Sequence, residues 1–221
     1  PIFFYFFPVI WFWQYFFQKM PIRKIFTIAL IMGILVSPWA IRNFLIFDEL
    51  VINTASSGHI LWEGNNPWND TGGVSGTFQN SDAWLNVVPE GLTELDEDQW
   101  KKDQAFAFIS GNPTVFVENG VRKFVRLWSL WPNSVDHQSW IYKAISLFSF
   151  GPILFFSLIG VWVLKENRRD IALMMGLVGY ITLLHVVTLG SIRYRLPLEP
   201  IMIVIASMAL INLYKRYNGK S

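Results

Sequence analysis

The sequence predicts an all-α polytopic membrane protein with about five transmembrane helices and a mainly helical exported region of about 100 residues between the second and the third. Composition is the first observation: 52% of the 221 residues are hydrophobic, 17% are aromatic and only 15% are charged. In soluble domains about a quarter of the residues are charged. The second observation is a set of apolar runs close to the roughly 20 residues that a membrane-spanning helix needs. The third is the placement of basic residues between those runs.

Five apolar runs are expected to span the membrane: residues 2–17, 25–41, 144–164, 171–189 and 196–214. They divide the chain into two transmembrane helices (1–41), an exported region (42–143), three transmembrane helices (144–214) and a cytoplasmic tail (215–221). Pro1 opens the chain inside an apolar run, with no charged segment and no small-residue cleavage site, which is not the pattern of a signal peptide. We therefore expect this chain to be part of a longer polytopic protein.

The basic residues orient these spans, because positive charge concentrates on the cytoplasmic side of membrane proteins. Alternation across the spans places three basic clusters on one face: Lys19, Arg23 and Lys24; Lys165, Arg168 and Arg169; Lys215, Arg216 and Lys220. Region 42–143 and segment 190–195 then lie on the exported face of what we expect to be a bacterial inner membrane. The sequence contains no cysteine, which excludes disulfides and thiolate metal sites. The net charge of +2 does not indicate a nucleic-acid partner.

The exported region is predicted to begin with a loop and to continue as two helices. Residues 56–76 are rich in Gly, Asn and Pro, which is typical of a loop. Thr93 is a good N-cap with acidic residues after it, and Asn112–Pro113 is a good start for the next helix. Helix 113–131 is amphipathic and carries tryptophans. It suits the membrane interface, and packing inside the exported region is an equally good interpretation.

The segment GSIRYRLPLEP, residues 190–200, contains the best candidate for a binding site. Arg193 and Arg195 lie on the exported side, against the usual charge bias, and two guanidiniums at headgroup depth are suited to a lipid phosphate. Beside them, at the outer mouth of two adjacent helices, we expect His185, Tyr194 and Glu199. Two other interpretations stay open: an Arg195–Glu199 salt bridge, and contact of the arginines with ordinary headgroups. His185 alone is more often a packed polar residue than a ligand.

Three stretches carry a resemblance to a known superfamily. They are SPWAIRNFLIFDELVINTASSGHILWEGNNP (37–67), AFAFISGNPTVFVENGVRKFVRLW (105–128) and RYRLPLEPIMIVIAS (193–207). In this order they resemble the C-terminal part of bacterial GT-C membrane glycosyltransferases, such as the dolichyl-phosphate-mannose protein mannosyltransferases and the lipid A aminoarabinose transferase. Together they lie between residues 37 and 207 of the chain, and they are specific for the superfamily but not for its substrate.

The resemblance implies sugar transfer from a polyprenyl-phosphate donor to a glycan, lipid or protein acceptor on the exported face. It implies that Arg193 and Arg195 hold the donor phosphate, and that Arg42 with Asn65 and Asn66 shapes the pocket. In such enzymes the catalytic carboxylate lies in the first exported loop. We therefore expect it in the missing N-terminal part, and expect this chain to be inactive alone. The resemblance assigns no metal or cofactor. None of Glu63, Asp70 and Asp82 has a context that marks it as a replacement base.

Two functions from other classes remain as alternatives: a lipid-linked-oligosaccharide flippase or other transporter, and a non-catalytic membrane scaffold. Apart from His185, the last three predicted spans carry no ionisable residue at mid-depth. Ion-coupled transporters usually place such groups there. The sequence therefore favours the transferase over the transporter, with membrane lipids and a polyprenyl-phosphate sugar as the expected partners.

Overall fold

The computed structural model describes residues 5–49, 51–52, 56–73, 87–134, 137–164 and 168–219, and these ranges contain helices and no strand. The all-α class is therefore confirmed. The elements are α1 (Phe7–Phe16), α2 (Ile22–Phe47), α3 (Ser57–Gly64), α4 (Glu94–Gly111), α5 (Pro113–Leu127), α6 (Trp140–Val163), α7 (Arg168–Val187), the 3-10 helix η5 (Ile192–Leu198) and α8 (Glu199–Tyr217). Of the predicted features, residues 74–76, Asp82, Lys165 and Lys220 lie outside the described residues, as does the side chain of Arg168.

Three helices of the described chain are long and apolar enough to cross a membrane: Ile22–Phe47, Trp140–Val163 and Ile192–Tyr217. They correspond to the second, third and fifth predicted spans. The fourth corresponds to a shorter apolar stretch, Ile171–Val187. The first corresponds to α1, whose 10 residues give a length of about 15 Å against a hydrocarbon core of about 30 Å. The chain thus has the helices of a membrane protein, and the number of five spans stays a prediction.

Several boundaries differ from the predicted ones. α2 continues past residue 41 to Phe47 and ends at Asp48, whose φ of 55° is left-handed. Arg42 therefore lies within a helix rather than at the start of the exported region, because arginine is a good helix former and apolar residues follow it. α6 begins at Trp140, before residue 144, and α8 runs to Tyr217, into the predicted tail.

Region 42–143, which was predicted to be exported, contains a helix where a loop was predicted. Residues 57–64 form α3, because the stretch SGHILWEG has its glycines near the ends and apolar residues that bury against α4. Trp62 packs with Ala105 of α4 in one small core. Asp98 of α4 accepts hydrogen bonds from the His59 backbone amide (3.0 Å) and the Ser57 hydroxyl (3.2 Å). The prediction of a loop was thus wrong for the first half of 56–76.

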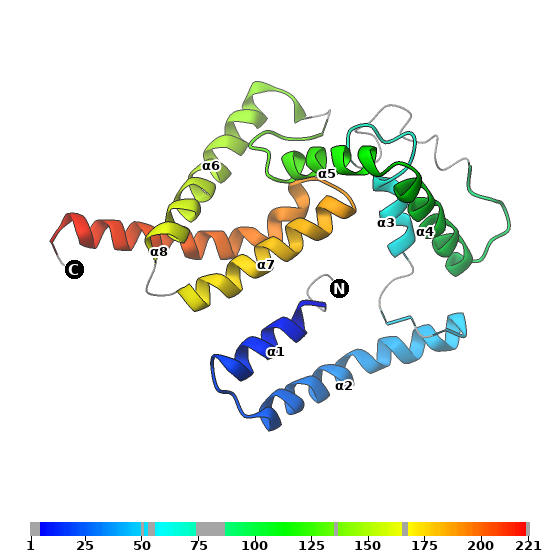
Figure 1. The fold of residues 1–221 in the computed structure, drawn as a ribbon, viewed down its shortest axis with the longest axis horizontal. Coiled ribbons are helices and arrows are strands. Elements are labelled where there is room, and N and C mark those ends of the chain that lie inside the picture. Colours follow the sequence, from blue (N-terminus) through cyan, green and yellow to red (C-terminus); the bar gives the residue numbers. More distant parts are fainter. Residues whose placement is uncertain are drawn as a thin grey trace.

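The two later helices of this region match their predicted starts. Thr93 caps α4 by accepting a hydrogen bond from the Asp96 amide at 3.2 Å. Asn112 occupies the N-cap position of α5, although its side chain makes no capping bond. α5 ends at Leu127, four residues before the predicted end at 131, so Trp131 lies beyond the helix. In Figure 1, α5 lies across the outer ends of α7 and η5.

The apolar helices α6, α7 and α8 lie together (Figure 1). α6 and α8 pack against each other and approach closely at Gly160. A Cβ atom at Gly160 would lie 2.6 Å from Ile205 Cγ2 and 2.8 Å from the Ile205 carbonyl oxygen. Between α7 and α8 a core forms from Leu164, Ile171 and Ile205. A small residue at position 160 thus sets the distance between two candidate spans.

Gly160→Ala is expected to destabilise the protein, because overpacking a close contact costs about 1–3 kcal/mol. For a chain of this size that corresponds to a decrease in the thermal midpoint of about 2–12 °C. Gly151→Ala in the same helix is the matched control, because its Cβ would meet only Leu147 Cδ1 at 3.6 Å, an ordinary contact. Thermal unfolding in detergent measures both variants, and equal midpoints would contradict the close α6–α8 approach.

Candidate functional site

The turn after α3 is closed by buried asparagines. Asn66 Nδ2 donates to the carbonyl oxygens of Trp62 (2.9 Å) and Glu63 (3.1 Å). Asn69 Nδ2 donates to the carbonyl oxygens of Glu63 (2.7 Å) and Gly73 (3.0 Å). Both side chains are at most 3% exposed. The backbone around Glu63 is therefore fixed by side-chain amides that have little contact with solvent.

Asn65 and Lys123 join this turn to α5 and to the end of α7. Asn65 Nδ2 donates to the carbonyl oxygens of Leu61 (2.9 Å) and Val187 (2.8 Å). Lys123 Nζ donates to Asn65 Oδ1 (2.8 Å) and to the Val187 carbonyl oxygen (3.3 Å). The Lys123 side chain is 0% exposed, and burial lowers its pKa from 10.5 to about 7. The Lys123 amine on α5 thus bonds to two other elements, the turn after α3 and the end of α7, and both acceptors are neutral.

Close backbone contacts complete the junction. A Cβ atom at Gly64 would lie 1.8 Å from the Thr188 carbonyl oxygen, and one at Gly190 would lie 2.5 Å from Lys123 Cα. The Gly190 amide donates to the Gly72 carbonyl oxygen at 3.2 Å. Gly72 has a φ of +69°, which only glycine adopts readily. We call Gly64, Asn65, Gly72, Lys123 and Gly190 the junction.

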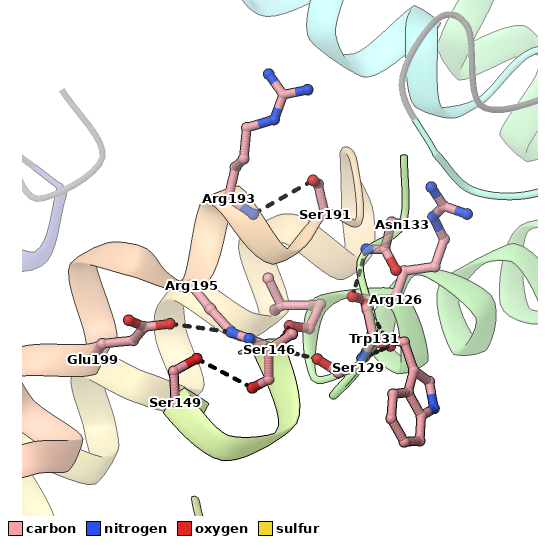
Figure 2. Close-up of polar contacts among 11 residues, drawn as sticks. Arg126, Ser129, Trp131, Asn133, Ser146, Ser149, Ser191, Arg193, Arg195 and Glu199 are labelled. Atoms are coloured by element: carbon pink, nitrogen blue, oxygen red, sulfur yellow. Dashed lines mark hydrogen bonds and ion pairs between the residues drawn. The ribbon is translucent and has the colours of Figure 1, made fainter. Parts of the chain in front are cut away.

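Arg195 is buried, and its guanidinium is bonded to the protein (Figure 2). It is 3% exposed. Its Nε donates to Glu199 Oε1 at 3.3 Å, and Nη1 donates to the carbonyl oxygens of Leu127 (3.4 Å) and Ser129. The guanidinium also lies over the Phe150 ring, 3.5 Å from its centre. Arg195 therefore fixes η5 to the end of α5 and to α6.

Arg193 is exposed, and Figure 2 shows its side chain pointing away from Arg195. Among the described residues its guanidinium makes no hydrogen bond or ion pair that the structure records. Arg193 and Arg195 were expected to bind one phosphate together, and the structure does not have them in that arrangement. The Arg195–Glu199 salt bridge, which was another interpretation of the sequence, is present. The reason is local: residues 192–198 form a 3-10 helix, in which residues i and i+2 point to different sides.

Beside Arg193, aromatic and acidic groups gather at the same end of α7. The His185 and Tyr194 rings are stacked, with centres 4.4 Å apart and planes 7° from parallel. His185 is 5% exposed, and neither of its ring nitrogens has a hydrogen-bond partner in the described part of the chain. Glu63 precedes Gly64 and Asn65, which contact Thr188 and Val187 at this end of α7. We call Glu63, His185, Arg193 and Tyr194 the outer mouth.

The other predicted pocket residues lie elsewhere. Arg42 Nη1 donates to Asn43 Oδ1 at 3.2 Å, and its guanidinium lies over Trp39, so both recorded contacts are within α2. Asn65 and Asn66 are buried in the turn after α3.

The sequence analysis did not identify Lys123 or Glu63 as residues of the site. A polar residue on an amphipathic helix is normally assigned to solvent, and no sequence signal places Glu63 beside the end of α7.

An apolar cavity of about 510 Å³ lies between α5, α6, α7 and α8. Phe124 and Trp128 of α5, Leu154 of α6, Thr182 of α7 and Met202 of α8 are among the residues that line it. Its lining is almost entirely hydrophobic, which suits a hydrocarbon chain rather than a polar metabolite.

No cluster of three or more His, Asp or Glu side chains in the described ranges is arranged to hold a metal ion. Comparisons of the chain with protein-family models, with curated proteins and with solved structures find no match.

Lys123→Met is expected to remove a pH dependence of stability. The amine titrates at about pH 7 in the folded protein and near pH 10.4 when unfolded. Between these values the unfolded state binds more protons, so the free energy of unfolding rises with pH by up to about 1.4 kcal/mol per unit. Below about pH 7 both states are protonated and this slope vanishes.

Denaturant unfolding in detergent micelles between pH 6 and pH 9 measures this slope. Lys102→Met is the control, because Lys102 is only partly buried and lies on α4. It should keep the wild-type slope. If the slope of the free energy of unfolding against pH is unchanged in Lys123→Met, the pH dependence does not come from the buried amine of Lys123, and the prediction is wrong.

Proposed function

We propose that this chain is the C-terminal part of an integral-membrane glycosyltransferase of the GT-C type in a bacterial inner membrane. The full-length enzyme transfers a sugar from a polyprenyl-phosphate donor to an acceptor on the exported face. The observation that carries the proposal is Arg193, an exposed guanidinium at the start of an apolar span, where positive charge is disfavoured. The guanidinium of Arg195 is bonded to Glu199 and to a backbone carbonyl oxygen of the protein. Arg193 is therefore the arginine of η5 that can bind a ligand.

A lipid-linked phosphate fits the surroundings of Arg193. The planar guanidinium can bond phosphate bidentately and keeps its charge at any physiological pH. The apolar cavity between α5 and α8 can take part of a hydrocarbon chain. The proposal therefore assigns Arg193 to the donor phosphate, and Arg195 becomes a positioning residue that holds η5 in place.

The surface of α5 supports contact with lipid. Its polar residues Asn119 and Lys123 are at most 1% exposed, whereas Val117, Val121 and Val125 are at least 60% exposed. This burial is the reverse of what a helix surrounded by water would show. A bilayer surface or other apolar surroundings would cover the valines, in agreement with the predicted interfacial helix.

The chemistry assigns a clear role to Arg193. In the transfer, the bond between the anomeric carbon and the phosphate oxygen breaks, and the acceptor oxygen bonds to that carbon while its proton passes to a carboxylate base. The departing polyprenyl phosphate gains negative charge as the bond breaks. Arg193 would stabilise that charge, which is the electrostatic contribution that most lowers such barriers.

Arg193→Ala is expected to lower sugar transfer in membranes by about tenfold to a hundredfold, because a hydrogen bond to a charged group contributes about 1.5–3 kcal/mol. Arg193→Lys should restore little of the lost transfer, since lysine keeps the positive charge but cannot bond a phosphate bidentately as a planar guanidinium does. Arg195→Ala should lower the amount of folded protein. Because this chain is expected to be inactive alone, transfer is measured in membranes that contain the full-length enzyme, with radiolabelled polyprenyl-phosphate sugars, and is normalised to protein level.

Arg23→Ala is the matched control, because Arg23 is exposed and belongs to a predicted cytoplasmic cluster. It should transfer as the wild type does. Wild-type transfer by Arg193→Ala would contradict the role given to Arg193. Absence of transfer by the wild-type protein would contradict the proposed function and would favour a scaffold.

A further inference from the structure

Helices α3 and α4 lie side by side (Figure 1), and their backbones come into direct contact. A Cβ atom at Gly58 would lie 1.8 Å from the Asp98 carbonyl oxygen, a distance that only glycine permits. The Asp98 carboxylate accepts hydrogen bonds from the His59 amide (3.0 Å) and from the Ser57 hydroxyl (3.2 Å). One residue of α4 thus holds the first turn of α3.

A second contact between these helices joins a histidine to a buried lysine. His59 Nδ1 lies 3.1 Å from Lys101 Nζ, and Lys101 is 4% exposed. Lys101 also forms an ion pair with Glu97, one turn earlier in α4. An ammonium group has donors and no acceptor, so the ring nitrogen that bonds to it carries no proton. The contact therefore requires a neutral imidazole with its proton on Nε2.

Protonation of His59 is opposed at this place. It would put a proton on Nδ1, remove the acceptor and leave two cations 3.1 Å apart. Burial and the charge of Lys101 lower the pKa of His59 from its ordinary value of 6.5. The carboxylates of Glu63 on α3, and of Asp98 and Glu97 on α4, act in the opposite direction without reversing the shift. The folded protein thus keeps His59 neutral to a lower pH than the unfolded chain does.

We infer that α3 and α4 form an acid-sensitive contact, in which neutral His59 binds Lys101 and protonation of His59 releases α3 from α4. The closed state takes up this proton at a lower pH than the open state does. The fraction of open molecules therefore rises as the pH falls below about 6.5, by up to about tenfold per pH unit. Well above this pH, His59 is neutral in both states and the pH dependence disappears.

The other end of α3 does not respond to acid in this way. Asn65, the residue after α3, bonds to Lys123 and to the Val187 carbonyl oxygen. Lys123 keeps its proton as the pH falls, and its amide and carbonyl acceptors do not titrate. Acid should therefore separate α4 from α3 and leave α3 attached to the end of α7. Neither contact involves Arg193, so this behaviour does not depend on the proposed transfer reaction.

Hydrogen–deuterium exchange of the protein in nanodiscs at about pH 7.5 and about pH 5.5 measures this opening. Protection factors are compared, because they remove the intrinsic pH dependence of amide exchange. Protection of residues 57–64 should fall by about three- to tenfold at the lower pH. Protection of residues 201–214, within α8, should stay within about twofold of its value at the higher pH.

His59→Gln should abolish this fall, because the amide oxygen of glutamine can accept a hydrogen bond from Lys101 and does not titrate. His137→Gln is the matched control, since His137 is exposed and its ring contacts Tyr142. It should keep the wild-type fall. If His59→Gln already exchanges faster than the wild type at the higher pH, Lys101→Gln gives the second measurement. Its amide can donate to a neutral His59 or accept from a charged one, so its fall should also be smaller.

The acid-sensitive contact is disproved if the wild type has the same protection of residues 57–64 at both pH values. It is also disproved if this protection falls as much in His59→Gln and Lys101→Gln as in the wild type. An equal loss of protection in residues 201–214 would mean that acid destabilises the whole protein, and would overturn the inference as well. A fall that is confined to α3 and α4 and depends on His59 would establish the contact.

Discussion

The hydrogen bond from Lys123 to Asn65 is the contact on which the packing of α3 and α5 against the end of α7 depends. Lys123 reaches Asn65 Oδ1 at 2.8 Å from a position with no solvent exposure. Removing an ammonium from water is costly unless its donors are satisfied. The fold meets that cost with carbonyl and amide oxygens from two other elements, α3 and the end of α7. Glycines at 64 and 190 allow the backbones to come close enough for this.

Two consequences follow from this junction. It turns the polar face of α5 inward, so the valines of that helix face outward, where apolar surroundings are needed to cover them. It also places the backbone next to Glu63 against the end of α7, where Gly64 approaches Thr188 and Asn65 bonds to Val187. Arg195 contributes separately by fixing η5 to the end of α5 and to Phe150. The outer mouth is thus a product of tertiary contacts rather than of one sequence motif.

The sequence predicted what depends on local patterns. Apolar runs predicted the helices Ile22–Phe47, Trp140–Val163 and Ile192–Tyr217, and Thr93 predicted the start of α4. The predictions that were wrong concerned features that depend on contacts between residues distant in the sequence. Helix α3 forms in a Gly- and Asn-rich stretch because Trp62 buries against α4. The two arginines of η5 point in different directions because this segment is a 3-10 helix with three residues per turn, where a loop was expected. Lys123 and Glu63 could not be singled out, since their roles exist only once α3, α5 and α7 meet.

Hydrogen–deuterium exchange of Lys123→Met in nanodiscs tests the central role of the junction most directly. Loss of the ammonium should release α3 and the end of α7 together, because both bond to it. Exchange should therefore rise in segments 61–73 and 187–195 at once, while segment 201–214 of α8 stays as protected as in the wild type. A rise confined to α5, with segments 61–73 and 187–195 unchanged, would contradict the idea that one buried lysine holds α3 and α5 to the end of α7.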